Sequence, residues 1–245
     1  MITAIEELSL NAWPSLQTML YDGWVIRFAN GYTKRANSVN PLYASTLDLD
    51  EKIRFCKRIY QSNKLPVVFK MTPAVCPDHL EKRLSAGGYR QDSPTSVQVM
   101  GLGSVDAQGT GEVNLQEILA EEWLDDFCRM NAVAESHRET LRQILINIVP
   151  RHCFVSLKSD EKAIACGLGV LQSGYIGLFD IVTDAASRNR GYGQKIVNSI
   201  LAWGRQNGAR EAYLQVMLDN ATALHLYSKI GFVEKYQYWY RILNY

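Results

Sequence analysis

The pattern of apolar and polar positions is clearest around one stretch in the second half of the chain. Tyr175–Thr183 is almost continuously apolar and contains β-branched and aromatic residues, which is typical of a strand buried on both faces. From position 194 to about 206, apolar residues recur at helical spacing, and Gly208 stands where such a helix would end. A short basic loop, 188–193, joins the two. The pattern therefore predicts a strand, a loop and a helix in direct succession.

The rest of the second half predicts a layered arrangement of helices and strands. The expected elements are helices at 115–130 and 137–149, strands at 152–157, 164–171 and 212–217, a helix at 221–230, and one or two aromatic strands over 232–242. This order predicts an α/β (α+β) fold in which helices flank a mixed, twisted sheet.

The first half predicts a similar set of elements. We expect a helix at 2–20 that ends in a polar turn, strands at 24–28 and 32–39 around the hairpin signal Asn30-Gly31, a helix at 49–60, a strand at 65–71, a short helix at 77–84 and a strand at 95–102. The glycine-rich stretch 101–111 is the best domain boundary. The chain therefore divides into a half at 1–103 and a half at 112–245.

The two halves resemble each other at a nearly constant offset. Gly88-Tyr89 aligns with Gly231-Phe232, and Asn40-Pro41 aligns with Asp184-Ala185. The copies differ at the loop, because 44–49 replaces 188–193 with a sequence that has no glycine and no basic residue. We therefore predict two tandem copies of one unit with a single functional site, in the second half.

The loop 188–193 has the chemistry of an anion-binding turn. The first N–H groups of a helix lack intrahelical partners, and the helix dipole places partial positive charge at that end. Gly191 and Gly193 allow close approach of the backbone, and Arg188 and Arg190 supply charge. Two interpretations remain open: a pyrophosphate site, or an ordinary turn with a solvated basic edge.

Composition narrows the choice of partners. Lys and Arg number 26 against 25 for Asp and Glu, so nothing in the charge favours nucleic acid or an acidic membrane. The apolar runs are too short to span a bilayer, and the first residues lack the basic start of a signal peptide. Five scattered cysteines fit reduced thiols, and no His, Cys or Asp set has metal-ligand spacing. We expect a cytoplasmic protein without a metal.

Two motifs in the second half resemble those of the GNAT superfamily of N-acetyltransferases. Arg188-x-x-Gly191-x-Gly193 after a strand is similar to the acetyl-CoA motif of that superfamily. The segment 220–232 resembles its N-x-x-A-x-x-L-Y-x-x-x-G-F pattern. The resemblance covers roughly 112–245, and the first half is similar, more loosely, to the N-terminal part of two-halved GNAT proteins.

The resemblance implies acetyl-CoA as co-substrate and a set of residues that bind it. Backbone groups of the central strand would hold the pantetheine arm and the acetyl carbonyl, the loop would take the pyrophosphate, and the start of the next helix would add contacts. The implied cofactor-binding residues are Ile181, Val182, Thr183, Arg188, Asn189, Arg190, Gly191, Tyr192, Gly193, Asn220 and Ala223. Asn220 is equally suited to cap that helix.

The resemblance also implies catalytic roles for two residues. Tyr227 falls at the general-acid position of the superfamily, where it would protonate the departing thiolate; the alternative is a core aromatic. Asp180, the only carboxylate within the central strand, is the candidate base, because an apolar setting makes a carboxylate a better proton acceptor. The more familiar glutamate position of the superfamily is Gly177 here, so a water chain is a rival base.

The acceptor is the least defined part of the prediction. Unusual polar and aromatic residues in the first half either line an acceptor site or form a core tryptophan with a solvated hairpin: Trp24, Arg27, Tyr32, Lys34, Arg35 and Asn37. We expect an acetyl-CoA-dependent N-acetyltransferase acting on a primary amine of a small molecule or peptide, with a homodimer left open. The alternative is a non-catalytic acetyl-CoA sensor or scaffold.

Overall fold

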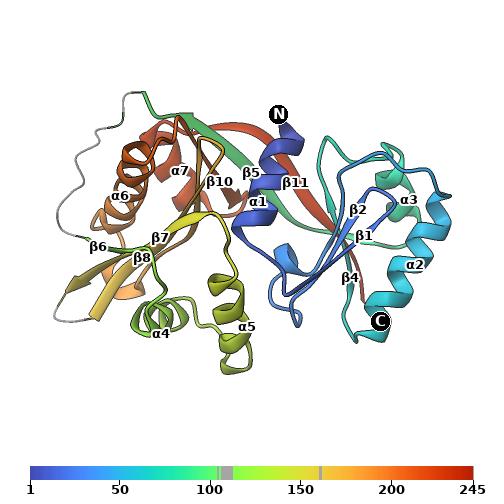
Figure 1. Ribbon diagram of the computed structural model, residues 1–245, viewed down its shortest axis with the longest axis horizontal. Helices are drawn as coiled ribbons and strands as arrows, with labels where there is room; N and C mark the ends of the chain where they lie inside the picture. Colours follow the sequence, from blue (N-terminus) through green and yellow to red (C-terminus); the bar gives the residue numbers. More distant parts are fainter. Residues whose placement is uncertain (104, 106–112, 160–161, 245) are drawn as a thin grey trace. The chain divides into compact units, whose positions relative to one another are not determined.

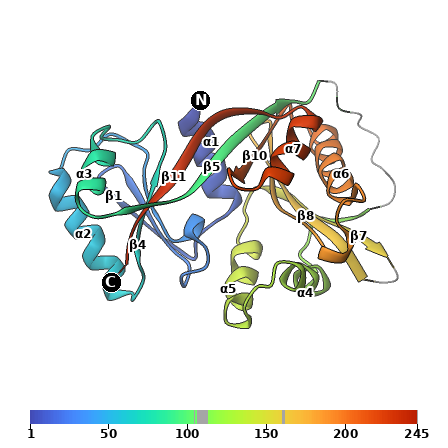
Figure 2. The same cartoon turned by 180° about the vertical axis from the view of Figure 1, so that it is seen from behind.

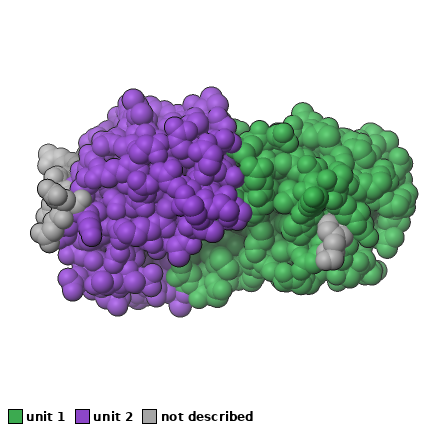
Figure 3. Space-filling model, turned by 90° about the horizontal axis from the view of Figure 1, so that it is seen from below, with its two compact units in different colours: residues 1–97, 216–220, 234–245 green, residues 98–215, 221–233 purple. Residues whose placement is uncertain are grey.

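The computed structural model describes residues 1–103, 105, 113–159 and 162–244 (Figure 1). The chain forms two compact units, which Figure 3 colours separately. Unit 1 contains residues 1–97, 216–220 and 234–245, and unit 2 contains residues 98–215 and 221–233. Each unit is a mixed sheet with flanking helices, which confirms the predicted fold class. Most of the glycine-rich stretch that we expected as a domain boundary lies outside the described residues.

Unit 1 is built on a sheet with the strand order β1-β2-β3-β4-β11, and most of β5, which also belongs to this unit, lies beside β11. Its elements are α1 (Ile2–Ala12), β1 (Gln17–Tyr21), β2 (Trp24–Phe28), the 3₁₀ helix η1 (Lys34–Ala36), β3 (Val39–Pro41), α2 (Leu49–Ser62), β4 (Val67–Met71), α3 (Leu80–Ala86), most of β5 (Arg90–Gly101) and nearly all of β11 (Val233–Leu243). β3 and β4 are parallel, and the other pairs of this sheet are antiparallel.

Unit 2 is built on the strand order β5-β10-β9-β8-β7-β6, with the end of β5 at one edge. Its elements are β6 (Asn114–Gln116), α4 (Glu121–Met130), α5 (Glu135–Ile146), β7 (Arg151–Ser159), β8 (Lys162–Gln172), β9 (Tyr175–Thr183), the 3₁₀ helix η2 (Ala185–Ser187), α6 (Tyr192–Gln206), β10 (Glu211–Met217) and α7 (Ala221–Ile230). β9 and β10 are parallel, and the pairs from β9 to β6 are antiparallel.

Both units contain the repeat that the sequence predicts. In each, three antiparallel strands lead into a parallel crossover, β3–α2–β4 in unit 1 and β9–α6–β10 in unit 2, and a further helix and strand follow. The last strand of each copy, β5 and β11, lies largely in unit 1, and only the end of β5 belongs to unit 2, where it lies beside β10. The division into halves at 1–103 and 112–245 stays a prediction, and the two compact units have different bounds.

Two predicted helices are shorter than expected. The first ends at Ala12 instead of position 20, and Gln17–Tyr21 forms β1, which pairs with β2. Pro14 explains the end, because a proline disfavours helical geometry at the residue before it. The helix expected from position 115 begins at Glu121, since Asn114–Gln116 is hydrogen-bonded along β7 as a strand.

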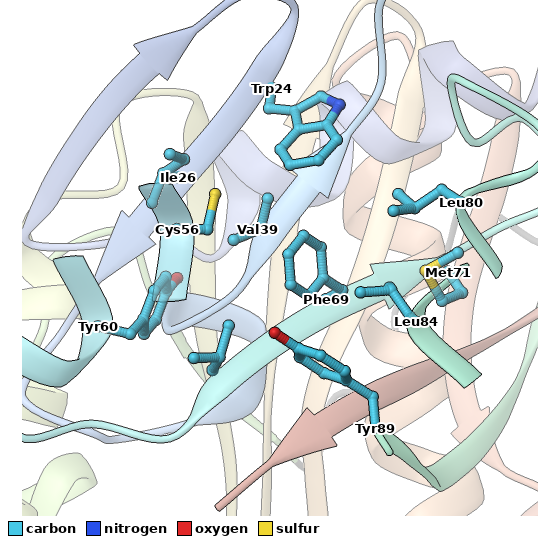
Figure 4. Packing of buried hydrophobic residues seen from close by; sticks show 11 residues of the cluster. Trp24, Ile26, Val39, Cys56, Tyr60, Phe69, Met71, Leu80, Leu84 and Tyr89 are labelled. Atoms are coloured by element: carbon cyan, nitrogen blue, oxygen red, sulfur yellow. The ribbon is translucent and has the colours of Figure 1, made fainter. Parts of the chain in front are cut away.

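Three of the six unusual residues of the first half, Trp24, Arg27 and Asn37, are buried in unit 1, whereas the other three are half-buried. Trp24 is fully buried in the core cluster that Figure 4 shows, and its Nε1 donates to the Cys76 carbonyl at 3.0 Å. Arg27 is also buried and donates to the carbonyl oxygens of Leu10, Trp13 and Arg35.

The same interior holds Asn37, whose Oδ1 accepts the N–H groups of Ala29 and Gly31 at 2.7 and 3.0 Å. Trp24 is therefore a core residue, as one interpretation expected. Arg27 and Asn37 belong to neither expected class, because both are buried and bind backbone groups: Asn37 those of the turn 29–33, and Arg27 those of Leu10, Trp13 and Arg35.

Candidate functional site

The centre of unit 2 is a pair of parallel strands that separate. β9 and β10 are paired from Tyr175 and Glu211 up to Leu178 and Leu214. Beyond that point β9 continues to Thr183 and β10 continues to Met217, but the register between them ends. The second half of β9 therefore presents backbone N–H and C=O groups along the side where the ladder with β10 has stopped. Such groups can bind the amides of an extended ligand.

A bulge in β9 lies where the strands separate. In the pairing of β9 with β8, Cys166 lies opposite Val182 and Leu168 lies opposite Phe179, so Asp180 and Ile181 share one opposing residue. Asp180 has a positive φ of 52°, which is uncommon for a residue other than glycine. The bulge redirects the strand, and it places the half-buried carboxylate of Asp180 near the buried thiol of Cys166. Burial, and next the charge of Asp180, raise the pKa of that thiol.

The predicted anion-binding loop leads directly from this strand into α6. Asn189 and Gly191 have φ angles of 61° and 80°, and Gly191 is the N-cap of α6. No acidic residue lies in the first turn of α6, and no side chain caps its N-terminus. Backbone turns of this kind, in which left-handed residues recur, form concave surfaces lined by N–H groups. Arg188 and Arg190 are exposed beside them.

The first turn of α6 lies close to both the end of β9 and to α7. A Cβ atom placed on Gly193 would lie 3.5 Å from the Oγ1 of Thr183 and 3.6 Å from the side chain of Leu226. Figure 2 shows α6 and α7 next to each other. The structure therefore brings together the end of the central strand, the basic loop and the helix that carries Tyr227.

Tyr227 is the best-defined side chain of the candidate site. It is 8% exposed, lies in α7 and packs edge-on against Phe232 with ring centroids 6.0 Å apart. Burial raises its pKa to about 12. The phenol is therefore protonated throughout the neutral range and can act as a hydrogen-bond donor. The burial of this ring fits both the role of a general acid and the alternative of a core aromatic.

The glycine at the more familiar base position is required by packing. A Cβ atom on Gly177 would lie 2.6 Å from Phe179 and 2.6 Å from the ring of Tyr213. Tyr213 is 1% exposed, so its ring fills the space that a side chain at position 177 would need. No glutamate fits there. The sequence shows the missing glutamate but not the tyrosine that replaces its volume, because the two residues lie on different strands.

Two other predicted contacts lie at the start of α7. Asn220 is exposed, directly precedes α7 and donates its backbone N–H to the Met217 carbonyl at 3.1 Å. It belongs to the segment 216–220 of unit 1, whereas Ala223 lies in the first turn of α7 in unit 2. Their roles as cofactor contacts stay predictions.

The residues that the structure describes include no group of three or more His, Cys, Asp or Glu side chains placed to hold a metal ion. The helices within the described ranges are all too short or too polar to cross a membrane. The five cysteines are free thiols, and Cys56, Cys153 and Cys166 are buried.

The separating parallel strands, the bulge and the basic loop before α6 define a class: the protein is an acyltransferase with the GNAT fold, as the motifs predicted. The chain belongs to the family described as "Probable histone acetyltransferase Rv0428c C-terminal", whose model matches residues 1–241. It is 27% identical over 248 residues to the uncharacterized N-acetyltransferase YobR of Bacillus subtilis (strain 168), and that alignment covers 98% of each chain.

Solved structures with little sequence identity share the fold. A GCN5-related N-acetyltransferase from Kribbella flavida matches with a TM-score of 0.69 at 12% identity, over 98% of this chain and 94% of that one. A tandem GNAT protein from the clavulanic acid biosynthesis pathway matches with a TM-score of 0.63 at 10% identity, over 97% and 87% of the two chains. The second match agrees with the two copies seen here. Proteins of the GNAT fold use acetyl-CoA.

Proposed function

We propose that unit 2 binds acetyl-CoA and supports direct transfer of the acetyl group to a primary amine of a small molecule or peptide. The observation that carries this proposal is the separation of β9 from β10. The end of β9 leads through η2 into the basic loop, and the first turn of α6 lies close to α7, the helix of Tyr227. When bound, acetyl-CoA supplies an activated acyl group that an amine can attack.

The residues present fit the chemistry of this co-substrate. Backbone groups of Ile181, Val182 and Thr183 lie beyond the end of the β9–β10 ladder and can bind the amides of the pantetheine arm. The N–H groups of 188–193 can bind the pyrophosphate, with Arg188 and Arg190 offsetting its charge. No acidic side chain in the first turn of α6 opposes the phosphates. Ala223 would add a contact from the first turn of α7.

Tyr227 is proposed to donate to the departing sulfur. A phenol whose pKa is about 12 gives its proton to a thiolate whose acid has a pKa near 8.5 at a cost of roughly 5 kcal/mol. Tyr227 therefore acts first as a hydrogen-bond donor, and full proton transfer requires the negative charge that the sulfur acquires as it leaves. The rigid placement of the ring against Phe232 supplies the fixed direction that such a donor needs.

Asp180 is proposed as the base that takes a proton from the acceptor amine. An amine of the lysine type has a pKa near 10.4 and must be neutral before it attacks. Asp180 lies at the bulge, half-buried and within the part of β9 that the separation exposes. We expect Asp180→Asn to lower kcat/KM by about 10²–10⁴. Unchanged kcat/KM across the pH range would instead assign the step to a water chain.

The acceptor is proposed by chemical class. The description of the matched family names a histone acetyltransferase, and the lysine side chain of a peptide is a primary amine of the proposed kind. We propose neither nucleic acid nor a membrane as a partner, and we expect the reaction to take place in the cytoplasm. A homodimer remains compatible with this function.

The test is release of free thiol from acetyl-CoA in the presence of an amine panel that contains lysine-rich peptides, polyamines and aminoglycoside antibiotics. We expect at least one amine to stimulate release. Tyr227→Phe should then lower kcat by about 10²–10⁴ while calorimetry shows nearly unchanged acetyl-CoA affinity. Tyr175→Phe, which removes a hydroxyl from the far end of β9, is the matched control and should retain full turnover.

Each contrary outcome has a distinct meaning. Acetyl-CoA binding without thiol release for every amine would favour the alternative of a sensor or scaffold. Full turnover by Tyr227→Phe would remove that residue from the mechanism and leave it as a core aromatic.

A further inference from the structure

One arginine joins α4 to the segment that precedes the cofactor loop. The Nη1 of Arg129 donates to the Oδ2 of Asp184 at 2.8 Å. Its Nη2 donates to the Oδ1 of Asp126 at 2.8 Å and to the Ala163 carbonyl at 2.6 Å. A single guanidinium therefore connects α4, β8 and the residue that follows β9.

Asp184 organises the turn between β9 and the loop. Its Oδ1 accepts the N–H of Ala186 at 3.0 Å, and its carbonyl accepts the N–H of Ser187 at 2.9 Å. Its own N–H donates to the Ile164 carbonyl of β8 at 2.8 Å. These bonds close the 3₁₀ helix η2, from which the chain passes directly into Arg188. The orientation of one carboxylate thus fixes where the loop begins.

We propose that Arg129 is a positioning residue for acetyl-CoA binding. It holds the Asp184 carboxylate in the rotamer that caps η2, and so it aligns the N–H groups of 188–193 with the pyrophosphate. Arg129 does not touch the cofactor. This inference rests on the proposed function, because it assigns a role within the same site.

Loss of the Arg129 guanidinium should affect the alignment of the loop 188–193 more than the stability of the fold. Arg129 is 43% exposed at its side chain, and an ion pair of such exposure contributes only about 0–1 kcal/mol to folding. Hydrogen bonds from N–H groups to a phosphate, in contrast, are charge-assisted and depend steeply on geometry, so a small displacement of the loop weakens them. Removal of the guanidinium should therefore change the melting temperature little and the affinity for acetyl-CoA considerably.

The experiment compares calorimetric Kd and steady-state KM for acetyl-CoA in four variants of the full chain. Arg129→Gln should raise both about tenfold, with kcat within about twofold and the melting temperature nearly unchanged. Asp184→Asn keeps an oxygen for Ala186 but offers an amide to Arg129, so it should give the same result. The double variant should bind acetyl-CoA as well as either single variant, since both changes break the same contact between Arg129 and Asp184. Arg129→Lys should keep only part of the affinity for acetyl-CoA, because an ammonium lacks the planar arrangement of N–H donors of a guanidinium.

Arg138→Gln is the matched control. Arg138 lies in α5 and binds Asp125 and Glu121, so its loss removes an exposed ion pair of α4 without contact to η2. Its Kd for acetyl-CoA should equal that of the wild type.

Three results would overturn the inference. Equal Kd values for Arg129→Gln and the wild type would show that the link is dispensable. A loss of affinity together with a large fall in melting temperature, in both Arg129→Gln and Arg129→Lys, would assign Arg129 a role in folding only. Absence of acetyl-CoA binding by the wild type would overturn the proposed function as well, so the two failures are distinguishable.

Discussion

The two copies of the strand–loop–helix turn differ in what is available to accept hydrogen bonds from the backbone N–H groups of the loop. In unit 2, the loop before α6 has two left-handed residues, exposed arginines and no side-chain cap. In unit 1, the loop before α2 is filled by carboxylates of the chain itself. The carboxylate of Asp22 accepts the N–H groups of Thr46 and Leu47, each at 3.0 Å.

Asp22 takes the place that an external anion would take. Besides the two N–H groups, its carboxylate accepts the hydroxyl of Thr46 at 2.8 Å and the ammonium of Lys52 at 3.0 Å. Asp48 caps α2 by accepting the N–H of Glu51 at 3.0 Å. Hydrogen bonds from the backbone of Leu47 and Thr46 hold the pKa of Asp22 far below its ordinary value.

The difference teaches that a helix N-terminus alone does not predict a ligand. Both loops precede the helix of a parallel crossover, and both have N–H groups that need an acceptor. Unit 1 meets that need internally, from the turn between β1 and β2, whereas we propose that acetyl-CoA meets it in unit 2. We therefore expect one acetyl-CoA per chain.

The largest effect is expected when the second loop is made to resemble the first. Gly191→Asp adds a carboxylate at the N-cap of α6, where it can accept the N–H groups of the first turn and repel phosphate. We expect calorimetry to show one acetyl-CoA site in the wild type and none in the variant, a loss of at least about 100-fold in affinity.

The control for this change is at the other end of the same helix. Gly208 also has a positive φ, of 94°, and open space where a Cβ atom would be. Gly208→Asp introduces the same strain and charge away from the loop and should bind acetyl-CoA normally. If Gly191→Asp still titrates with acetyl-CoA, a site exists in unit 1 and the comparison fails.

A smaller effect is expected when the internal anion of unit 1 is neutralised. Asp22→Asn leaves one oxygen for the N–H groups but removes the charge that faces the buried ammonium of Lys52. Burial lowers the pKa of that lysine, and Asp22 is the group that offsets the shift. We expect thermal unfolding at neutral pH to shift down by about 2–4 °C, with acetyl-CoA affinity unchanged.

The difference in melting temperature between the wild type and Asp22→Asn should depend on pH in a defined direction. Because the folded pKa of Asp22 is depressed, its contribution is fully present above the unfolded value of about 3.9 and is lost as the pH falls below it. The gap in melting temperature between wild type and Asp22→Asn should therefore narrow in acid. Asp50→Asn, which removes an exposed partner of Arg83, serves as control. A gap that stays constant down to acidic pH would contradict the assignment.

The sequence predicts the second-half elements well because their signals are local. The strand before the loop, the helix after it and the helix 221–230 have the observed type and nearly the observed bounds, since periodicity, caps and glycines lie within each segment. The difference at α1 is also local, because Pro14 lies within the segment 2–20 and disfavours helical geometry at the residue before it.

The remaining features depend on residues that are distant in the chain. The contact of Asp22 with the loop at 46–47, the packing of Tyr213 against Gly177 and the link from Arg129 to Asp184 each join two elements that only the fold brings together. A single sequence could indicate Asp184 as a turn residue, since aspartate often caps helices. It could not indicate which arginine binds it.

The position of β11 beside β4 has a consequence for the synthesis of the protein on the ribosome. The described helices of unit 2 are synthesised before β11, the strand that lies beside β4 in the sheet of unit 1. The edge of β4 that pairs with β11 is therefore unpaired during much of synthesis. At 5–20 residues per second, the delay between β4 and β11 is roughly 10–30 s. An uncovered strand edge can pair with another nascent chain. The sheet of unit 1 is therefore complete only after β11 has been synthesised.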